Sequence, residues 1–149
     1  MYFPLMPDDA TPAVPARMLP GLDDDNRAFW TGGADGQLRI AQCTQCALWT
    51  SPPAADCPDC GGVLVARPVS GRGKVFTYTV NYQPFNPLVP VPYVIAIIEL
   101  NEQADLRIAS NIVDCEPDSV YVGMPVEVRF ERHDVDEDSV FVPVFAPRA

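Results

Sequence analysis

The alternation of apolar and polar residues is strongest in the second half of the chain. In residues 74–82 every second side chain is apolar or aromatic, so one face of the predicted strand carries Phe76, Tyr78, Val80 and Tyr82. Threonine and asparagine occupy the opposite face. The pattern predicts a strand with one apolar face.

Four further segments have strand patterns: residues 93–100, 106–113, 126–131 and 140–145. The first is apolar throughout, which is typical of a strand covered on both faces. In the last, Pro143 indicates an edge strand. Five short strands separated by turn signals predict a small Greek-key barrel of the OB type.

The first part of the chain lacks this periodicity. Residues 1–20 hold five prolines, and we interpret residues 1–22 as an extended arm that docks on a partner. Acidic residues 23–25 then precede a short predicted helix, and glycines 32 and 33 end it. We expect Phe29 and Trp30 to be its packing face, and we favour a role in covering the following module over contact with a ligand.

Four cysteines form two C-x-x-C pairs separated by ten residues, namely Cys43 with Cys46 and Cys57 with Cys60. Two such pairs can present four thiolates in a tetrahedron, the geometry that Zn²⁺ prefers in closed structural sites. The alternatives are two disulfides or unrelated thiols, and the doubled spacing favours zinc. Residues 36–66 are therefore predicted to form a zinc ribbon that needs its metal to fold. The lone Cys115 has apolar neighbours and is interpreted as a small buried hydrophobe.

The predicted fold is mainly β, in three parts: an arm (1–22), a helix with a zinc ribbon (23–67) and an OB-fold domain (68–149). The chain has 149 residues and a formal charge of −10, which disfavours nucleic-acid binding. The start has no signal-peptide pattern, and no apolar run is long enough for a membrane span. With cysteines kept as metal thiolates, these features predict a cytoplasmic protein without membrane contact.

Two groups of residues are candidates for binding a small ligand. Arg72 and Lys74 follow glycines in a turn that lacks the spacing of a P-loop. We therefore favour a purely structural interpretation of this turn over contact with a phosphate. The aromatic residues Phe76, Tyr78 and Tyr82 could stack on a base or on the adenine of a cofactor. Given the negative charge, we favour core packing for these three side chains over base stacking.

The segment between the first two barrel strands, residues 83–92, contains four prolines and is unusually apolar for a loop. A rigid apolar loop indicates docking to a protein or an acyl chain through Phe85, Leu88 and Val89. Equally, these three side chains could fold back and plug the end of the barrel.

Residues for catalysis are scarce. The sole histidine, His133, lies among charged residues and is expected in an exposed turn. The chain has no nucleophile elbow and no zinc-protease helix, and a site with four thiolates has no open position for a substrate. We expect no catalytic residue and no stand-alone enzyme.

The ordered motifs of residues 23–147 are similar to those of the DUF35 family, which pairs a rubredoxin-like zinc ribbon with an OB-fold. The motifs that carry this resemblance are Phe29-Trp30, Gly36-Gln37-Leu38, the two cysteine pairs, Gly71-x-Gly73-x-Val75-x-Thr77-Tyr78-Thr79, Pro92-Tyr93-Val94-Ile95-Ala96, Gly123-Met124-Pro125-Val126 and Pro143-Val144-Phe145. The resemblance implies structural zinc on Cys43, Cys46, Cys57 and Cys60. It supplies no catalytic residue.

The resemblance also implies an accessory, non-catalytic subunit that binds a thiolase-like or hydratase-like acyl-CoA enzyme and helps to hold or transfer CoA thioesters. One alternative is a stand-alone module that itself binds CoA or acyl-CoA through Arg72, Lys74 and the barrel aromatics. The other alternative is a protein that binds single-stranded nucleic acid, which is argued from the OB-fold alone. The negative charge makes us expect no nucleic-acid partner.

Overall fold

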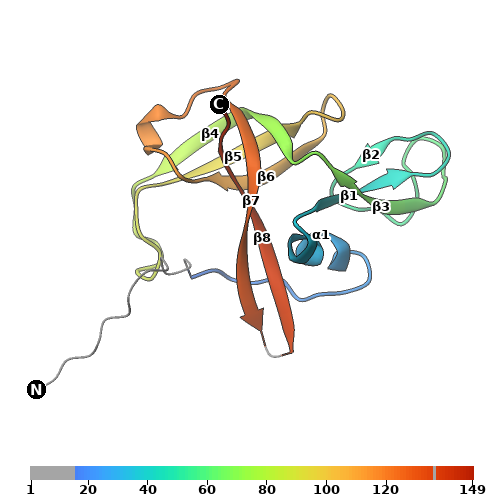
Figure 1. Ribbon diagram of the computed structural model, residues 1–149, viewed down its shortest axis with the longest axis horizontal. Helices are drawn as coiled ribbons and strands as arrows, with labels where there is room; N and C mark the ends of the chain where they lie inside the picture. Colours follow the sequence, from blue (N-terminus) through green and yellow to red (C-terminus); the bar gives the residue numbers. More distant parts are fainter. Residues whose placement is uncertain (1–15, 136) are drawn as a thin grey trace, which may run out of the picture.

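The computed structural model describes residues 16–135 and 137–149, and it shows a three-stranded antiparallel sheet beside a closed five-stranded barrel (Figure 1). A short helix lies between these two parts. The elements in chain order are α1 (Arg27–Thr31), the 3-10 turn η1 (Gly32–Asp35), β1 (Leu38–Cys43), β2 (Trp49–Thr50), β3 (Leu64–Val69), β4 (Arg72–Asn81), β5 (Tyr93–Leu100), β6 (Arg107–Ile112), η2 (Pro117–Ser119), β7 (Pro125–Val135) and β8 (Asp138–Pro147). The prediction of a mainly β chain with a ribbon and an OB barrel is confirmed.

The barrel strands follow the order β4-β5-β6-β8-β7, and antiparallel pairing of β4 with β7 closes it. Strands β6 and β8 run parallel and meet at one bridge, between Ile112 and Phe145. Fully buried aliphatic and aromatic side chains fill the interior, with Phe145, Ile98 and Val126 at 0% exposure. Leu38 and Ile40 of β1 belong to the same cluster, so the first ribbon strand begins inside the barrel core.

Two expectations for the strands are wrong. Strand β5 has one buried face, because Val94 and Ile98 are buried whereas Ile95 on the outer face is 41% exposed. The strand covered on both faces is β8, whose Phe145 lies in the barrel core while Val142 packs outside against Leu19, Leu22 and Trp30.

Strand β8 is not an edge strand, since it lies between β6 and β7. Pro143 is tolerated there because β6 and β8 share a single backbone bridge, so no long ladder on that side is interrupted. The Ser110 hydroxyl donates to the Pro143 carbonyl at 2.9 Å and links the two strands at this point.

The alternation expected in β4 is broken at Phe76. The register against β5 shifts between Val75 and Thr77, which is a β-bulge, so Val75 fills the core at 1% exposure. Phe76 is 43% exposed and lies under the guanidinium of Arg107, whose Cζ is 3.7 Å from the ring centroid. Tyr78 and Tyr82 are also exposed, so core packing is the wrong interpretation for these three aromatics.

Helix α1 connects the arm to both parts of the molecule. Asp23 Oδ1 accepts hydrogen bonds from the backbone N–H groups of Asp25 and Asn26, which precede the helix, so it shapes the turn before α1 and does not cap the helix itself. Phe29 and Trp30 meet edge to face, with centroids 4.8 Å apart. Phe29 packs in the cluster that contains Leu38 and Ile40, whereas Trp30 packs on β8; the prediction that both cover the ribbon is wrong for Trp30.

Residues 16–22 of the arm pass across the β7–β8 hairpin, and Leu19 and Leu22 pack on β8 (Figure 1). Most of the arm, residues 1–15, lies outside the described residues, so its docking stays a prediction. In the described part of the chain, every helix is too short or too polar to cross a membrane.

Candidate metal centre and apolar cavity

The four paired cysteines converge on one point of the ribbon. All four Sγ atoms lie within 4.8 Å of one another, with 3.5 Å between Cys43 and Cys60 and 3.6 Å between Cys46 and Cys57. Four sulfurs at about 2.3 Å from a zinc ion lie roughly 3.8 Å apart, so this spacing matches a tetrahedral site. The cysteines are not paired as disulfides.

The two knuckles repeat the same backbone arrangement. The carbonyl of Cys43 accepts from the N–H of Ala47, and the carbonyl of Cys57 accepts from Gly61. Both Ala47 (φ 66°) and Gly61 (φ 75°) are left-handed, which turns the chain back after each second cysteine. Backbone N–H groups of Gln45 and Cys46 point at Cys43 Sγ, and that of Asp59 points at Cys57 Sγ. These donors favour thiolates.

The ionisation of the four thiols fits a divalent cation. The backbone N–H of Cys46 is the main cause that lowers the pKa of Cys43 to about 6. Although the N–H of Leu48 lowers it, burial and the neighbouring sulfurs of Cys57 and Cys60 raise the pKa of Cys46 to about 12. The Cys43 thiolate thus forms easily while the Cys46 thiol resists further negative charge, and Zn²⁺ removes that repulsion. The four cysteines are placed to hold one metal ion, and the prediction of a structural zinc is confirmed.

Cys115 lies apart from this cluster. It is half-buried and packs against the barrel core, in keeping with its interpretation as a small hydrophobe.

A side chain of the barrel holds the ribbon in place. Gln103, in the turn between β5 and β6, accepts a hydrogen bond from the N–H of Trp49 at 2.9 Å and donates to the carbonyl of Trp49 at 3.0 Å. Its amide therefore pairs with β2 as a neighbouring strand would. In the same turn, Glu102 accepts from the N–H of Ser70 at 2.7 Å. Sequence reasoning missed both residues, because nothing in the local pattern marks a turn as a contact between domains.

A cavity of about 930 Å³ lies on the outer face of β5, β6 and β8. Residues from the arm, α1 and the proline-rich loop surround it. The lining includes Phe29, Trp30, Tyr93, Ile95, Ala109 and Val142. The sequence marked no such site, since its walls come from segments that lie far apart in the sequence.

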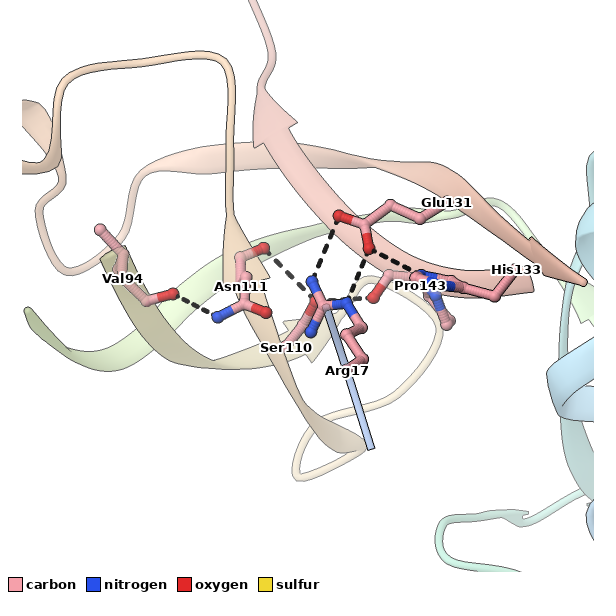
Figure 2. Close-up of polar contacts among 7 residues, drawn as sticks. All are labelled: Arg17, Val94, Ser110, Asn111, Glu131, His133 and Pro143. Carbon is pink, nitrogen blue, oxygen red and sulfur yellow. Dashed lines mark hydrogen bonds and ion pairs between the residues drawn. The ribbon is translucent and has the colours of Figure 1, made fainter. Parts of the chain in front are cut away.

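The polar side chains of this cavity bond within the protein (Figure 2). Arg17 Nε and Nη2 donate to the two carboxylate oxygens of Glu131 at 2.7 and 3.2 Å. His133 Nε2 lies 3.4 Å from Glu131 Oε1, and its side chain is 12% exposed. The expectation of an exposed turn at His133 is wrong, because the residue lies within β7.

The five residues predicted to bind a ligand do not line this cavity. Arg72 and Lys74 are exposed at the start of β4, and the exposed aromatics follow along the same strand. Next to Arg72, a hydrogen bond from Arg129 is the main cause that lowers the pKa of Glu127, and the charge of Arg72 adds to it. A role in ligand binding stays a prediction for these five residues.

The proline-rich loop presents two apolar side chains to solvent. Phe85 is 80% and Leu88 is 75% exposed, so the alternative that they plug the barrel is wrong. Val89 is half-buried and lies at the edge of the cavity. Docking through these three residues stays a prediction.

The architecture and the four-cysteine site define a protein that joins a zinc ribbon to an OB-fold barrel. Residues 30–64 match the family described as the rubredoxin-like zinc ribbon domain of ChsH2, and residues 66–131 match its C-terminal OB-fold domain. A DUF35 domain-containing scaffold protein of Methanocaldococcus jannaschii is 43% identical over 100 residues, which cover 65% of this chain and 70% of that protein. The chain belongs to the DUF35 family.

Two further relatives are larger or were solved in a complex. A probable enoyl-CoA hydratase alpha subunit of Thermomonospora curvata is 35% identical over 133 residues, 88% of this chain, but the chain spans only 40% of that subunit's length. A chain of the solved structure titled "Ltp2-ChsH2(DUF35) aldolase" is 32% identical, with a TM-score of 0.76, and the match covers 87% of this chain and 98% of that one.

Proposed function

We propose that this protein is a non-catalytic accessory subunit that docks on an acyl-CoA enzyme of the thiolase-like class and helps to hold or transfer CoA thioesters. The observation that carries the proposal is the exposed apolar tip of the loop of residues 83–92, which stands on a folded barrel. Exposed large apolar side chains that gather at one place mark protein interaction sites.

The loop is ordered by its own hydrogen bonds. The Asn81 side chain bonds both the N–H and the carbonyl of Gln83, and the Asn86 side chain accepts from the N–H of Leu88 at 3.0 Å. The N–H of Val89 donates to the Asn86 carbonyl at 2.9 Å. Because these bonds and the prolines hold the backbone, little conformational entropy is lost when Phe85 and Leu88 enter a partner's pockets.

A structural contribution of the zinc supports the non-catalytic part of the proposal. Four thiolates leave no open position on the ion. Within the described residues, the polar partner of His133 is Glu131, and Glu131 is itself paired with Arg17 of the arm. The scaffold function in the name of the archaeal relative agrees with this interpretation.

The names of the relatives support an acyl-CoA enzyme as the partner. One is a hydratase subunit and one was solved as part of an aldolase. A hydratase-like enzyme is therefore the alternative partner.

The test is co-elution with a thiolase-like enzyme on a gel-filtration column, using the zinc-loaded chain. The variant Phe85→Ser with Leu88→Ser is expected to weaken the complex by about 2 kcal/mol or more, the size typical of interface hot spots. The matched control is Tyr121→Ser with Val122→Ser, which removes two other exposed apolar side chains of the barrel and should leave the complex intact. A chain that elutes alone with thiolase-like and hydratase-like enzymes alike would refute the proposal.

Direct binding of CoA is the second candidate function. It is favoured by the exposed Arg72 and Lys74, which precede the exposed Phe76 and Tyr78 on β4 and Tyr82 just after it. Calorimetry with CoA separates the two candidates: heat that disappears in the variant Arg72→Ala with Lys74→Ala supports a module that binds CoA alone. The absence of heat at millimolar CoA leaves docking as the function.

A further inference from the structure

We propose that the cavity on the outer face of β5, β6 and β8 is a binding site for an uncharged apolar ligand with a long alkyl chain. This inference rests on the cavity itself and does not depend on the proposed docking to an enzyme. The ligand lies between the sheet and the chain's own segment 16–20.

The floor of the cavity consists of alternate residues of two paired strands. In the register of β5 with β6, Ile95 is opposite Asn111, and Ala109 lies two residues before Asn111 on the same face of β6. These residues face outward because the residues between them, such as Val94 and Ile98, fill the barrel core. Ala109 is exposed and small, so it leaves room above the sheet. The floor is thus flat and mostly apolar.

Aromatic rings form the walls. Phe29 and Trp30 stand at one side, held edge to face, and Tyr93 lies at the start of β5. Volumes of roughly 300–1,000 Å³ with apolar and aromatic linings are typical of small-molecule sites, and this cavity of about 930 Å³ falls at the upper end. The size suits a ligand of many carbon atoms.

The charges around the cavity select against an ionic ligand. Arg17 is bound by both carboxylate oxygens of Glu131. Arg107 forms ion pairs with Glu99 and Asp105 and stacks on Phe76. A phosphate or a carboxylate would have to displace these partners, whereas an apolar ligand loses nothing by leaving them in place.

The hydroxyl and amide groups of the floor are also engaged. The Ser110 hydroxyl donates to the Pro143 carbonyl, and the Asn111 amide donates to the Val94 carbonyl at 2.8 Å (Figure 2). The walls thus present few groups that need a polar partner from the ligand.

Segment 16–20 covers the cavity and is fixed at two points. Leu19 packs on the outer face of β8, and Arg17 is tied to β7 through Glu131. The carboxylate of Glu131 also contacts His133, so both neighbours hold it in place. Loosening the Arg17–Glu131 pair should free this cover and weaken ligand binding without disturbing the barrel core.

The experiment uses the full zinc-loaded chain and the neutral dye Nile red, with 1-dodecanol as a competitor. We expect saturable dye binding with about one site per chain, displacement by dodecanol and no displacement by CoA without an acyl group. Ala109→Phe, which fills the floor, should weaken dye binding about tenfold or more, whereas the control Ala104→Phe, on the exposed turn outside the cavity, should not.

A second pair of variants tests the cover. Arg17→Ala is expected to weaken dye binding about fivefold, and the charge exchange Arg17→Glu with Glu131→Arg is expected to restore it in part. The zinc content and the thermal unfolding midpoint of each variant are measured alongside, so that a failure to fold is recognised.

Three results would overturn the inference: no saturable dye binding to the folded wild-type chain, equal weakening by Ala109→Phe and Ala104→Phe, or displacement of the dye by CoA alone. Its failure is distinguishable from failure of the proposed function. A chain that co-elutes with an enzyme but binds no dye lacks the apolar site and keeps the docking role. A chain that binds the dye but no enzyme has the apolar site and lacks the docking role.

Discussion

The strands of the ribbon pair antiparallel, and so do those of the barrel except β6 with β8, yet different forces hold the two parts. In the ribbon after Ile40, the buried apolar side chains are the two cysteines Cys43 and Cys57, while Val63 and Val65 are exposed. The barrel has a continuous core with Phe145, Ile98 and Val126 fully buried. A sheet this small gains too little from burial to offset its chain entropy, so the metal supplies the difference. The barrel needs no such ligand.

The same comparison separates the two parts by function. The ribbon uses its cysteines to hold a conformation, whereas the exposed apolar loop and the cavity belong to the barrel and its coverings. Gln103 joins the parts, because it connects the barrel turn to the backbone of β2. The metal thus fixes the shape of a module that the barrel positions.

Removing the metal is the change with the largest expected effect. Chelation, or Cys43→Ser, should unfold the ribbon, since structural zinc contributes on the order of 10 kcal/mol. In NMR spectra the amide signals of residues 44–63 should collapse to disordered values, while those of Ile98 and Val126 stay dispersed. Cys115→Ser is the control and should keep one zinc per chain. Loss of the barrel signals together with the ribbon signals would show that the two parts are not held by separate forces.

Truncating the barrel core should have the next largest effect. Phe145→Ala is expected to destabilise the barrel by about 3–5 kcal/mol, because a fully buried ring leaves a cavity. Urea unfolding followed by barrel amide signals measures this change. The exposed Phe85→Ala should cost almost nothing, and similar midpoints for the two variants would contradict the burial of Phe145.

Removing the contact of Gln103 with Trp49 should cost less stability, but it should change how the ribbon is oriented on the barrel. Gln103→Ala leaves the N–H and the carbonyl of Trp49 without their side-chain partner and should cost about 1–2 kcal/mol. Residual dipolar couplings should show a changed or more variable orientation of the ribbon against the barrel, at unchanged zinc content. Gln103→Glu keeps the acceptor and loses the donor, so an intermediate effect is expected. An unchanged orientation in Gln103→Ala would assign that role to other contacts.

The smallest effect concerns a surface charge of the barrel. Arg129 lowers the pKa of Glu127, so in Arg129→Ala this pKa should rise toward the ordinary value of about 4.3. A carboxyl whose pKa is lower in the folded state than in the unfolded state stabilises the protein at pH values above its unfolded-state pKa. This stabilisation is lost as the pH falls through the folded-state pKa. The difference in free energy of unfolding between the wild-type chain and Arg129→Ala should therefore vanish in acid. A titration of the Glu127 carboxyl signal by NMR measures the shift. Equal midpoints in the two proteins would rule out the interaction.

The barrel and the metal site could be predicted because their signals are local. The two C-x-x-C pairs carry their own geometry, and the alternation of residues 126–131 identifies one face of β7. The β-bulge at Phe76 could not be predicted in this way. It depends on the pairing of β4 with β5, and one extra residue moves Val75 into the core in place of Phe76.

Contacts between distant segments explain the other errors. Strand β8 is buried on both faces because Leu19, Leu22 and Trp30 cover its outer side. Its residues 140–146 are apolar throughout, but the sequence does not show which distant segments cover them. The Arg17–Glu131 pair joins residues 114 positions apart, and it places His133 in a part-buried strand. The cavity is formed only by the assembly of these segments.

Sedimentation velocity on a mixture of the zinc-loaded chain and a thiolase-like acyl-CoA enzyme tests the proposed docking most directly. A boundary with the mass of a complex is expected for the wild-type chain and for the variant Tyr121→Ser with Val122→Ser, and it should be lost in the variant Phe85→Ser with Leu88→Ser. Separate boundaries for the wild-type chain and the enzyme, or a complex that persists without the two loop side chains, would contradict it.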